Sequence, residues 1–335
     1  MTDSKNAGEL SPALVETVAG LSAGSMATLI VHPLDIVKTR MQIHRSATNP
    51  SAQPTTVSVL RSLATQSDKP IAALYRGLTP NLLGNATSWA SFFFFKSRFE
   101  RGIVLLKSPR SGNNDGGNGN GNGRGLLTPQ DFFAASLLAG AATQVITNPI
   151  WVLKTRMLSS DRNAAGAYPS MWTGATRLLR EEGFLAFYRG LGVGMLAVSH
   201  GAVQFAVYDP ARRIYFRRRR NKEKRMGIKG GGGGGGDDKI ISNEATIVLS
   251  TVSKLVAGAT TYPLQVLRSR LQNYHAEEQF GSGVRGVVRQ LWLEEGVRGF
   301  YRGIIPGVVR VLPATWVTFL VYENVKFYLP RWVAA

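Results

Sequence analysis

The chain of 335 residues contains no cysteine, which excludes a disulfide framework and any chemistry that depends on a thiolate. Histidine is scarce as well, and the four histidines are too scattered to form a cluster of metal ligands. A glycine-rich phosphate loop is also missing, because the glycine run at 230–236 lacks the strand–loop–helix setting that such a loop requires. These absences argue against an enzyme, a bound cofactor or a metal site.

Acidic residues are few compared with basic ones. Lys and Arg together number 40 against 21 for Asp and Glu, so the net charge is +19. Such an excess points to an anionic partner, which could be nucleic acid, an anionic lipid surface or an anionic small molecule. Part of the excess lies in the run at 217–220, four arginines that are better explained as a segment beside lipid headgroups. We therefore expect no nucleic-acid partner.

Long uninterrupted apolar runs are rare, and the mean hydropathy is only −0.04. Six mostly apolar segments nevertheless exceed the ~20 residues that a helix needs to cross a bilayer. They occupy residues 12–42, 73–105, 130–158, 188–216, 243–272 and 301–328. Because each also carries polar residues, we expect helices with one face toward lipid and one lining a polar cavity. The alternative is buried helix pairs in a soluble repeat protein, which extraction by mild detergent but not by salt would exclude.

Three segments repeat one motif, a proline followed by basic residues five and seven positions later. They begin at Pro33, Pro149 and Pro263 and read PLDIVKTR, PIWVLKTR and PLQVLRSR. The prolines are separated by 116 and 114 residues, and a regular internal repeat of this kind determines the architecture. Proline inside a helix removes a backbone donor and bends the helix, so we expect three bent helices.

Each repeat also ends in a common way. The tripeptide Tyr-Arg-Gly occurs at 75–77, 188–190 and 301–303, and a second apolar segment follows each copy. Repeats 2 and 3 have Glu-Gly shortly before the tripeptide, whereas repeat 1 has Lys69-Pro70 in that place. Two low-complexity inserts, 108–125 and 217–239, lengthen the repeats and are too poor in apolar residues to fold, so we expect them to be disordered.

Together, the three proline motifs, the three Tyr-Arg-Gly tails and the six apolar segments resemble the mitochondrial carrier family. The resemblance implies an all-α membrane protein in which six tilted transmembrane helices form three pseudo-threefold repeats. The repeats would cover residues 12–105, 128–216 and 243–330. A short matrix helix would join the two spans of each repeat, near 54–67, 170–182 and 281–295, and both termini would face the intermembrane space.

The resemblance further implies a gate on the matrix side, formed where the three proline motifs meet. The residues assigned to this matrix gate are Pro33, Asp35, Lys38, Pro149, Trp151, Lys154, Pro263, Gln265 and Arg268. The pairing used by the family predicts an ion pair between Asp35 and Lys154. It also predicts a hydrogen bond between Gln265 and Lys38, and a cation–π contact between Trp151 and Arg268. The family's usual acid is present only in repeat 1, so the gate would hold one full ion pair.

A second gate on the cytoplasmic side would use an aromatic-acid-x-x-base motif on the second helix of each repeat. The motif is present at 208–212 and 322–326, but repeat 1 has Ser97 and Glu100 in those places. The residues assigned to this cytoplasmic gate are Asp209, Arg212, Glu323 and Lys326. Asp209 with Lys326 is the complete ion pair that the pattern leaves.

The substrate class is suggested by local strings. Trp151 after Pro149 resembles the branch of the family that moves nucleotides and nucleotide-like cofactors, and the segments 146–152, 199–205, 259–266 and 317–325 look most like the FAD/folate carriers. Carriers of pyrimidine nucleotides or NAD share the tryptophan and remain the alternative. A channel or uncoupler of the same fold is a further alternative, which measured exchange rather than leak would exclude.

The candidate substrate-binding residues lie about two turns beyond each Tyr-Arg-Gly or carry charge inside a span. They are Arg310, Lys254, Gly84, Asn85, Ala197, Val198, His200, Gln204 and Trp89. Arg310 is the strongest of them, since a guanidinium in an apolar run is costly unless it faces water or an anion, and its planar fork suits phosphate or carboxylate. A lipid-facing role for Trp89, a structural ion pair for Lys254 and helix packing for His200 and Gln204 are the alternatives.

The sequence therefore predicts a multi-pass protein of the mitochondrial inner membrane that moves FAD, folate or a related anionic cofactor by alternating access. We expect no resident cofactor and no metal, since FAD or folate would be the transported substrate. The other expected partner is anionic lipid of the inner membrane, cardiolipin in particular. The carrier is expected to be a monomer.

Overall fold

The computed structural model describes residues 12–44, 54–65, 69–107, 127–160, 167–225, 243–274 and 276–334, and these residues form helices and no strands. Each repeat opens with a long helix that contains the repeat's motif proline. These helices are α1 (Pro12–Ile43), α5 (Pro129–Ser159) and α9 (Asn243–Gln272). The start of α5 is fixed by a capping box, in which Thr128 accepts from the backbone of Asp131 and Asp131 bonds back to Thr128, with Pro129 at the first helical position.

Short helices follow each long helix, as the sequence predicted. They are α2 (Thr56–Thr65) and α3 (Pro70–Leu74) in repeat 1, α6 (Met171–Glu181) and the 3₁₀ helix η2 (Phe184–Tyr188) in repeat 2, and α10 (Ala276–Phe280) and α11 (Gly283–Gly299) in repeat 3. The second long segment is α4 (Leu78–Lys107) in repeat 1. It is divided in the others into α7 (Leu191–Ala197) with α8 (His200–Arg225), and α12 (Ile304–Val309) with α13 (Val311–Ala334).

The Tyr-Arg-Gly tail turns the chain from the short helices into the second long segment. Its glycines, Gly77, Gly190 and Gly303, have φ of 72°, 73° and 81°. Only glycine adopts this left-handed conformation without strain, and each glycine directly precedes a helix that begins at the next residue. The tripeptide is therefore a turn whose last residue has to be glycine.

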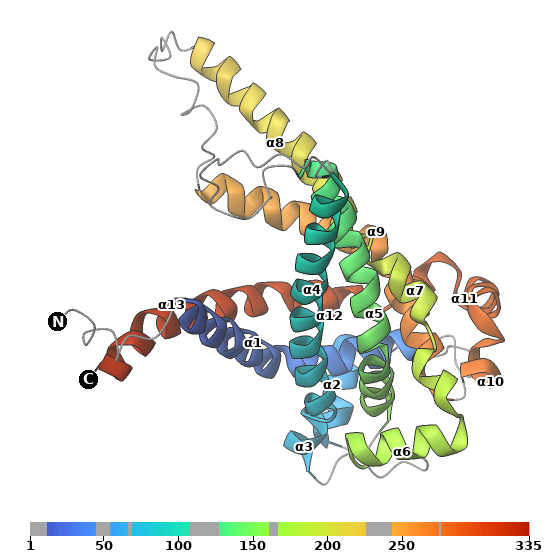
Figure 1. The fold of residues 1–335 in the computed structure, drawn as a ribbon. Coiled ribbons are helices and arrows are strands. Elements are labelled where there is room, and N and C mark those ends of the chain that lie inside the picture. The colour runs from blue at the N-terminus through green and yellow to red at the C-terminus, as the bar shows by residue number, and fades with distance from the viewer. Residues whose placement is uncertain are drawn as a thin grey trace.

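The long helices pair across repeat boundaries, with α4 against α5, α8 against α9, and α1 against α13. In Figure 1 the three pairs meet near the short helices and diverge from there, and the start of α1 and the end of α13 lie together at the opposite end. We call the end that holds α2, α3, α6, α10 and α11 the short-helix end, and the opposite end the diverging end. Three buried apolar clusters lie at the short-helix end, each formed mainly by one repeat, and two of them include residues of a neighbouring repeat.

Four helical segments in the described part of the chain are long and apolar enough to cross a membrane: Val15–Ile43, Gln130–Ser159, Phe184–Arg218 and Ile304–Trp332. The two remaining long helices, α4 and α9, are more polar. Their apolar side chains nevertheless face outward, and Trp89 of α4 is 64% exposed. Large exposed apolar side chains at such density are typical of a lipid-facing surface.

The structure corrects one prediction about the inserts. Residues 217–239 were expected to be disordered, but α8 continues to Arg225 and so includes the first nine of them. The arginines, lysines and glutamate in this stretch are good helix formers, so the helix continues once it has been started by its apolar part. Residues 226–239, and the whole insert at 108–125, lie outside the described residues.

Candidate functional site

In each repeat, the long helix is attached next to its motif proline to the Tyr-Arg-Gly turn of the same repeat. In all three repeats, the side chain just before the proline hydrogen-bonds the backbone carbonyl of the tail arginine. The bonds are His32 Nε2 with Arg76 O (2.9 Å), Asn148 Nδ2 with Arg189 O (3.2 Å) and Tyr262 OH with Arg302 O (3.2 Å). Three different side chains thus form one equivalent bond, and all three are buried.

The gate residues meet just beyond these prolines in the chain. Lys38 Nζ donates to Gln265 Oε1 at 2.8 Å, so the predicted hydrogen bond between α1 and α9 is confirmed. Lys38 also lies over the ring of Tyr262, with 5.5 Å between its Nζ and the ring centroid. The first repeat is therefore joined to the third at the gate.

The predicted ion pair between Asp35 and Lys154 is replaced by a different one. The carboxylate of Asp35 pairs with the guanidinium of Arg310, at the junction of α12 and α13, and accepts a hydrogen bond from Asn81 Nδ2 at 3.2 Å. Lys154 and Lys38 are close enough to act on Asp35 through space. The pairing was wrong because Arg310 is long enough to reach the gate, which a rule based on motif positions alone does not consider.

The predicted contact of Trp151 with Arg268 is also replaced. Trp151 has Lys154 of its own helix over its ring, with Nζ 4.8 Å from the centroid, and it packs against Gly84 of α4. Arg268 instead donates to Asn148 Oδ1 at 3.3 Å. A side chain at Gly84 would crowd Trp151, because a Cβ placed there would lie 3.2 Å from the indole. The small residue at this position therefore makes room for the tryptophan.

A second layer closes the short-helix end below these side chains. The last arginine of each proline motif donates from its Nε to a backbone carbonyl near the end of the next long helix. The bonds are Arg40 to Leu158 O (3.2 Å), Arg156 to Gln272 O (3.2 Å) and Arg270 to Gln42 O (3.0 Å). Because each repeat donates to another repeat, the three bonds form a ring, which we call the arginine ring.

Carboxylates from the Glu-Gly segments support the arginine ring in two repeats. Glu182 pairs with Arg156 and Arg189, and Glu295 pairs with Arg270 and Arg302. Repeat 1 has Lys69-Pro70 in the place of Glu-Gly. There, Arg76 donates to Met157 O at 2.6 Å, in the neighbouring repeat. Repeat 1 thus lacks the supporting carboxylate but keeps a contact between repeats, which Arg302 of repeat 3 also makes through His44 O at 2.7 Å.

Of the predicted substrate-binding residues, two contact gate residues: Arg310 pairs with Asp35, and Gly84 packs against Trp151. Asn85 donates to Thr28 Oγ1 at 3.2 Å, and His200 bonds Thr261 Oγ1 at 3.0 Å, so both connect helices. Val198 packs against Gly140, since a Cβ on that glycine would lie 2.5 Å from it. The remaining members are placed as follows: Ala197 and Gln204 are half-buried, Lys254 is exposed, and Trp89 is exposed and stacks on Phe93 of its own helix.

The residues assigned to the cytoplasmic gate lie at the diverging end, where the helix pairs are apart. Asp209 and Glu323 are exposed. Arg212 lies over Phe216 of its own helix, and Lys326 is 3.9 Å from Glu16 of α1. The predicted pair of Asp209 with Lys326 would need α8 and α13 to come together, so it stays a prediction for a state closed at this end.

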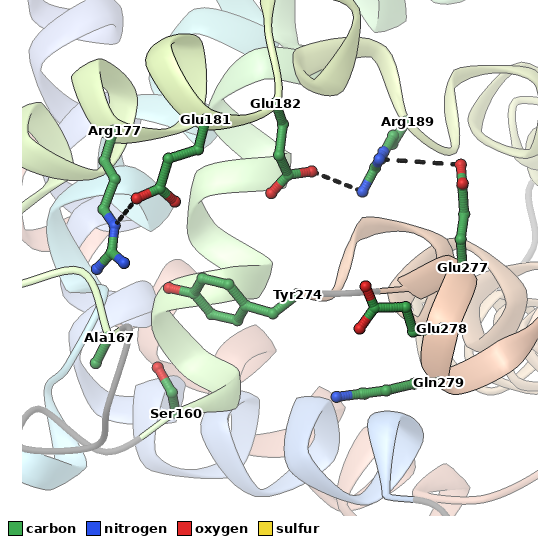
Figure 2. Close-up of a pocket in the computed structure, with 10 residues that line it drawn as sticks. All are labelled: Ser160, Ala167, Arg177, Glu181, Glu182, Arg189, Tyr274, Glu277, Glu278 and Gln279. Atoms are coloured by element: carbon green, nitrogen blue, oxygen red, sulfur yellow. Dashed lines mark hydrogen bonds and ion pairs between the residues drawn. The ribbon is translucent and has the colours of Figure 1, made fainter.

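A pocket of about 500 Å³ lies at the outer surface of the short-helix end, between α6 and α10. Figure 2 shows Arg189 between Glu182 and Glu277, and a separate pair of Arg177 with Glu181, around the ring of Tyr274. Burial raises the pKa of Tyr274 to about 12, so it stays protonated at neutral pH. The pocket adjoins the arginine ring, since Glu182 in its lining pairs with Arg156, and none of the residues assigned to the matrix gate lines it.

Sequence reasoning missed several polar residues that hold the gate together. They are His32, Gln42, Asn81, Asn148, Tyr262 and Gln272. Their signal is positional: three of them directly precede the motif prolines, and the two glutamines stand nine residues after a proline. Because the residue types differ between repeats, a search for repeated letters does not find the first group.

Comparison with known proteins agrees with this architecture. A family profile described as "Mitochondrial carrier protein" matches the chain three times, over residues 10–105, 127–219 and 241–331. The chain therefore belongs to the mitochondrial carrier family, whose members are transporters with three repeats of two membrane helices.

Individual relatives match over nearly the whole chain. The mitochondrial FAD carrier protein FLX1 of Saccharomyces cerevisiae is 36% identical over 330 residues, which is 95% of this chain and 98% of the yeast protein. Folate transporter 1, chloroplastic, of Arabidopsis thaliana is 31% identical over 316 residues, or 92% of each chain. Nicotinamide adenine dinucleotide transporter 1, chloroplastic, of the same plant is 30% identical over 320 residues, 94% of this chain and 92% of that protein.

Proposed function

We propose that this protein carries FAD or folate across the mitochondrial inner membrane by alternating access. The observation that supports this most is the position of Arg310. Its side chain is 37% exposed, and it lies where the diverging helix pairs meet the closed gate. A guanidinium fork there can bind the phosphate or carboxylate of a ligand that enters from the diverging end. The likeness to the yeast FAD carrier supports the same substrate class.

The state seen in the structure corresponds to one half of a transport cycle. The short-helix end, which faces the matrix in this family, is closed by the gate pairs and the arginine ring. In this proposal the diverging end faces the intermembrane space and admits the substrate. Release into the matrix then requires these bonds to break while the cytoplasmic-gate residues come together. Hydrogen bonds and ion pairs near neutral in net energy suit a closure that opens in every cycle.

The principal test of the proposal is uptake into proteoliposomes. We expect saturable uptake of radiolabelled FAD that unlabelled folate reduces, and that NAD and pyrimidine nucleotides reduce less. Uptake of radiolabelled NAD with no uptake of FAD would favour the second candidate, an NAD carrier, which the likeness to the plant NAD transporter supports. Uptake that does not saturate would indicate a channel. Bound anionic lipid and a monomeric state stay predictions, which native mass spectrometry would test.

Replacement of the central cation gives a sharper test. Arg310→Ala is expected to reduce FAD uptake at least a hundredfold, because a lost charge-assisted bidentate contact costs about 3 kcal/mol or more. Arg285→Ala, which removes an exposed arginine from α11, is the matched control and is expected to leave uptake within twofold. Equal uptake by the two variants would remove Arg310 from the substrate site.

A further inference from the structure

The ion pair between Asp35 and Arg310 joins two residues that the sequence assigned to separate tasks, one to the gate and one to the substrate. Asp35 lies on α1, two residues after Pro33, and Arg310 lies at the junction of α12 and α13. The pair therefore links α1 to the last long segment at the base of the diverging helices. A Cβ at Gly307, three residues before Arg310, would lie 3.6 Å from Lys38, so this junction rests on the gate itself.

The two partners differ in exposure. The side chain of Asp35 is 7% exposed, whereas that of Arg310 is 37% exposed. An anion that enters from the diverging end therefore reaches the guanidinium before it reaches the carboxylate. Arginine has five donors, so a free face remains for a second anion while Asp35 is still bound.

Asp35 does not depend on Arg310 alone. It accepts a hydrogen bond from Asn81, and Lys154 and Lys38 act on it through space. If Arg310 turned to another anion, Asp35 would stay hydrogen-bonded and close to two cations. Exchange of one anion for another on Arg310 would thus leave no buried charge without a partner, which keeps the cost of the exchange low.

We propose that Asp35 is the counter-ion of Arg310 in the empty carrier, and that the anionic group of the substrate replaces it. Binding would then release the link between α1 and the α12–α13 junction, so the closed short-helix end would be weakened only when a substrate is present. Asp35 also becomes a determinant of specificity, because a ligand has to compete with a carboxylate. A flavin without phosphate, such as riboflavin, cannot do so. This inference rests on the proposed function.

The first test compares ligand affinity in two variants. Asp35→Asn keeps the size of the side chain and removes the competitor, so the Kd for FAD is expected to fall about three- to tenfold, as it does when a larger fraction of a protein is competent to bind. The Kd for riboflavin should stay within twofold. Glu181→Gln is the matched control, since it removes one charge from exposed α6, and it should change neither value. Transport gives a second measurement: in Asp35→Asn, both the KM for FAD and the maximal rate of uptake should fall.

An unchanged Kd for FAD in Asp35→Asn, or an equal fall for riboflavin, would overturn the proposal. If Asp35→Asn did not fold, Asp35→Ser would be measured with the same expectations. Failure of the proposed function would give a different result in the binding assay. In that case FAD and folate would not bind the unaltered carrier at all.

A second test needs no substrate. Thermal unfolding of the empty carrier is compared for Arg310→Gln, Asp35→Asn and the double variant. If the two residues form an ion pair in the empty state, the loss of stability in the double variant should be smaller than the sum of the losses in the two single variants. Additive losses would contradict the pair whatever the transported substrate is.

Discussion

At the scale of single residues, the structure shows that position matters more than residue type. Histidine, asparagine and tyrosine precede the three motif prolines, yet each bonds the carbonyl of the tail arginine in its repeat. Asn148 has further partners, since it also binds Phe187 O and accepts from Arg268. The pair of Lys38 with Gln265 could be predicted, because the resemblance to the mitochondrial carrier family implies a pairing of these two motif positions. The ion pair between Asp35 and Arg310 could not be predicted from the sequence, because it depends on how far the arginine side chain extends.

One residue-scale prediction concerns pH. The half-buried ring of His44 lies beside Arg302 and Arg270, and burial, followed by these cations, lowers the pKa of His44 below 6.5. The folded carrier therefore holds His44 neutral, while the unfolded chain takes up a proton as the pH falls through about 6.5. This contribution to stability is present at neutral pH and is lost on acidification.

Replacement of this histidine tests that reasoning. The melting temperature of the detergent-solubilised protein should fall more steeply between pH 7.5 and 5.5 for the unaltered chain than for His44→Gln. Intrinsic tryptophan fluorescence would follow unfolding. Parallel pH profiles for the two proteins would show that His44 has the same pKa in both states.

At the scale of helices and turns, most of the architecture was predictable. The proline motifs predicted the three long helices with an internal proline, and the Tyr-Arg-Gly tails predicted where each second segment begins. The breaks before His200 and at Arg310 were not predicted, because the sequence there reads as one continuous apolar helix. The extension of α8 to Arg225 was also missed. The charged segment was expected to be disordered, although the helix propensity of its residues favours continuation of the helix.

Two glycines only two residues apart should respond differently to the same substitution. Gly190 has a φ of 73°, and a Cβ there would lie 3.3 Å from Gln272, so Gly190→Ala is expected to destabilise the carrier by about 1–2 kcal/mol. Gly192 is helical, and a Cβ there has no atom within 4 Å. Gly192→Ala is expected to be neutral or to stabilise by up to about 1 kcal/mol.

Chemical or thermal unfolding in detergent would compare these two variants. A lower melting temperature for Gly190→Ala alone is the predicted result. Equal shifts for both would mean that the left-handed turn is not required at the start of α7.

At the scale of the whole molecule, the closure is asymmetric. Each repeat contributes one donor to the arginine ring, but carboxylates support that ring in repeats 2 and 3, and the ion pair of Asp35 with Arg310 links repeats 1 and 3 above it. The threefold plan was readable from the spacing of the motifs. The asymmetry could be predicted only in part. The sequence shows which repeats lack the acidic residue of the motif, but the contacts that take its place depend on how the helices pack.

The measurement that tests the account most directly is to lock the gate. The chain has no cysteine, so Lys38→Cys with Gln265→Cys places a single pair of thiols where α1 and α9 are joined. A bifunctional methanethiosulfonate reagent would bridge them in proteoliposomes, and dithiothreitol would remove the bridge. We predict that FAD uptake falls to background when the bridge is present and returns when it is reduced, while FAD binding from the diverging end persists. Uptake that continues at the same rate with the bridge in place would contradict a path that opens at the short-helix end.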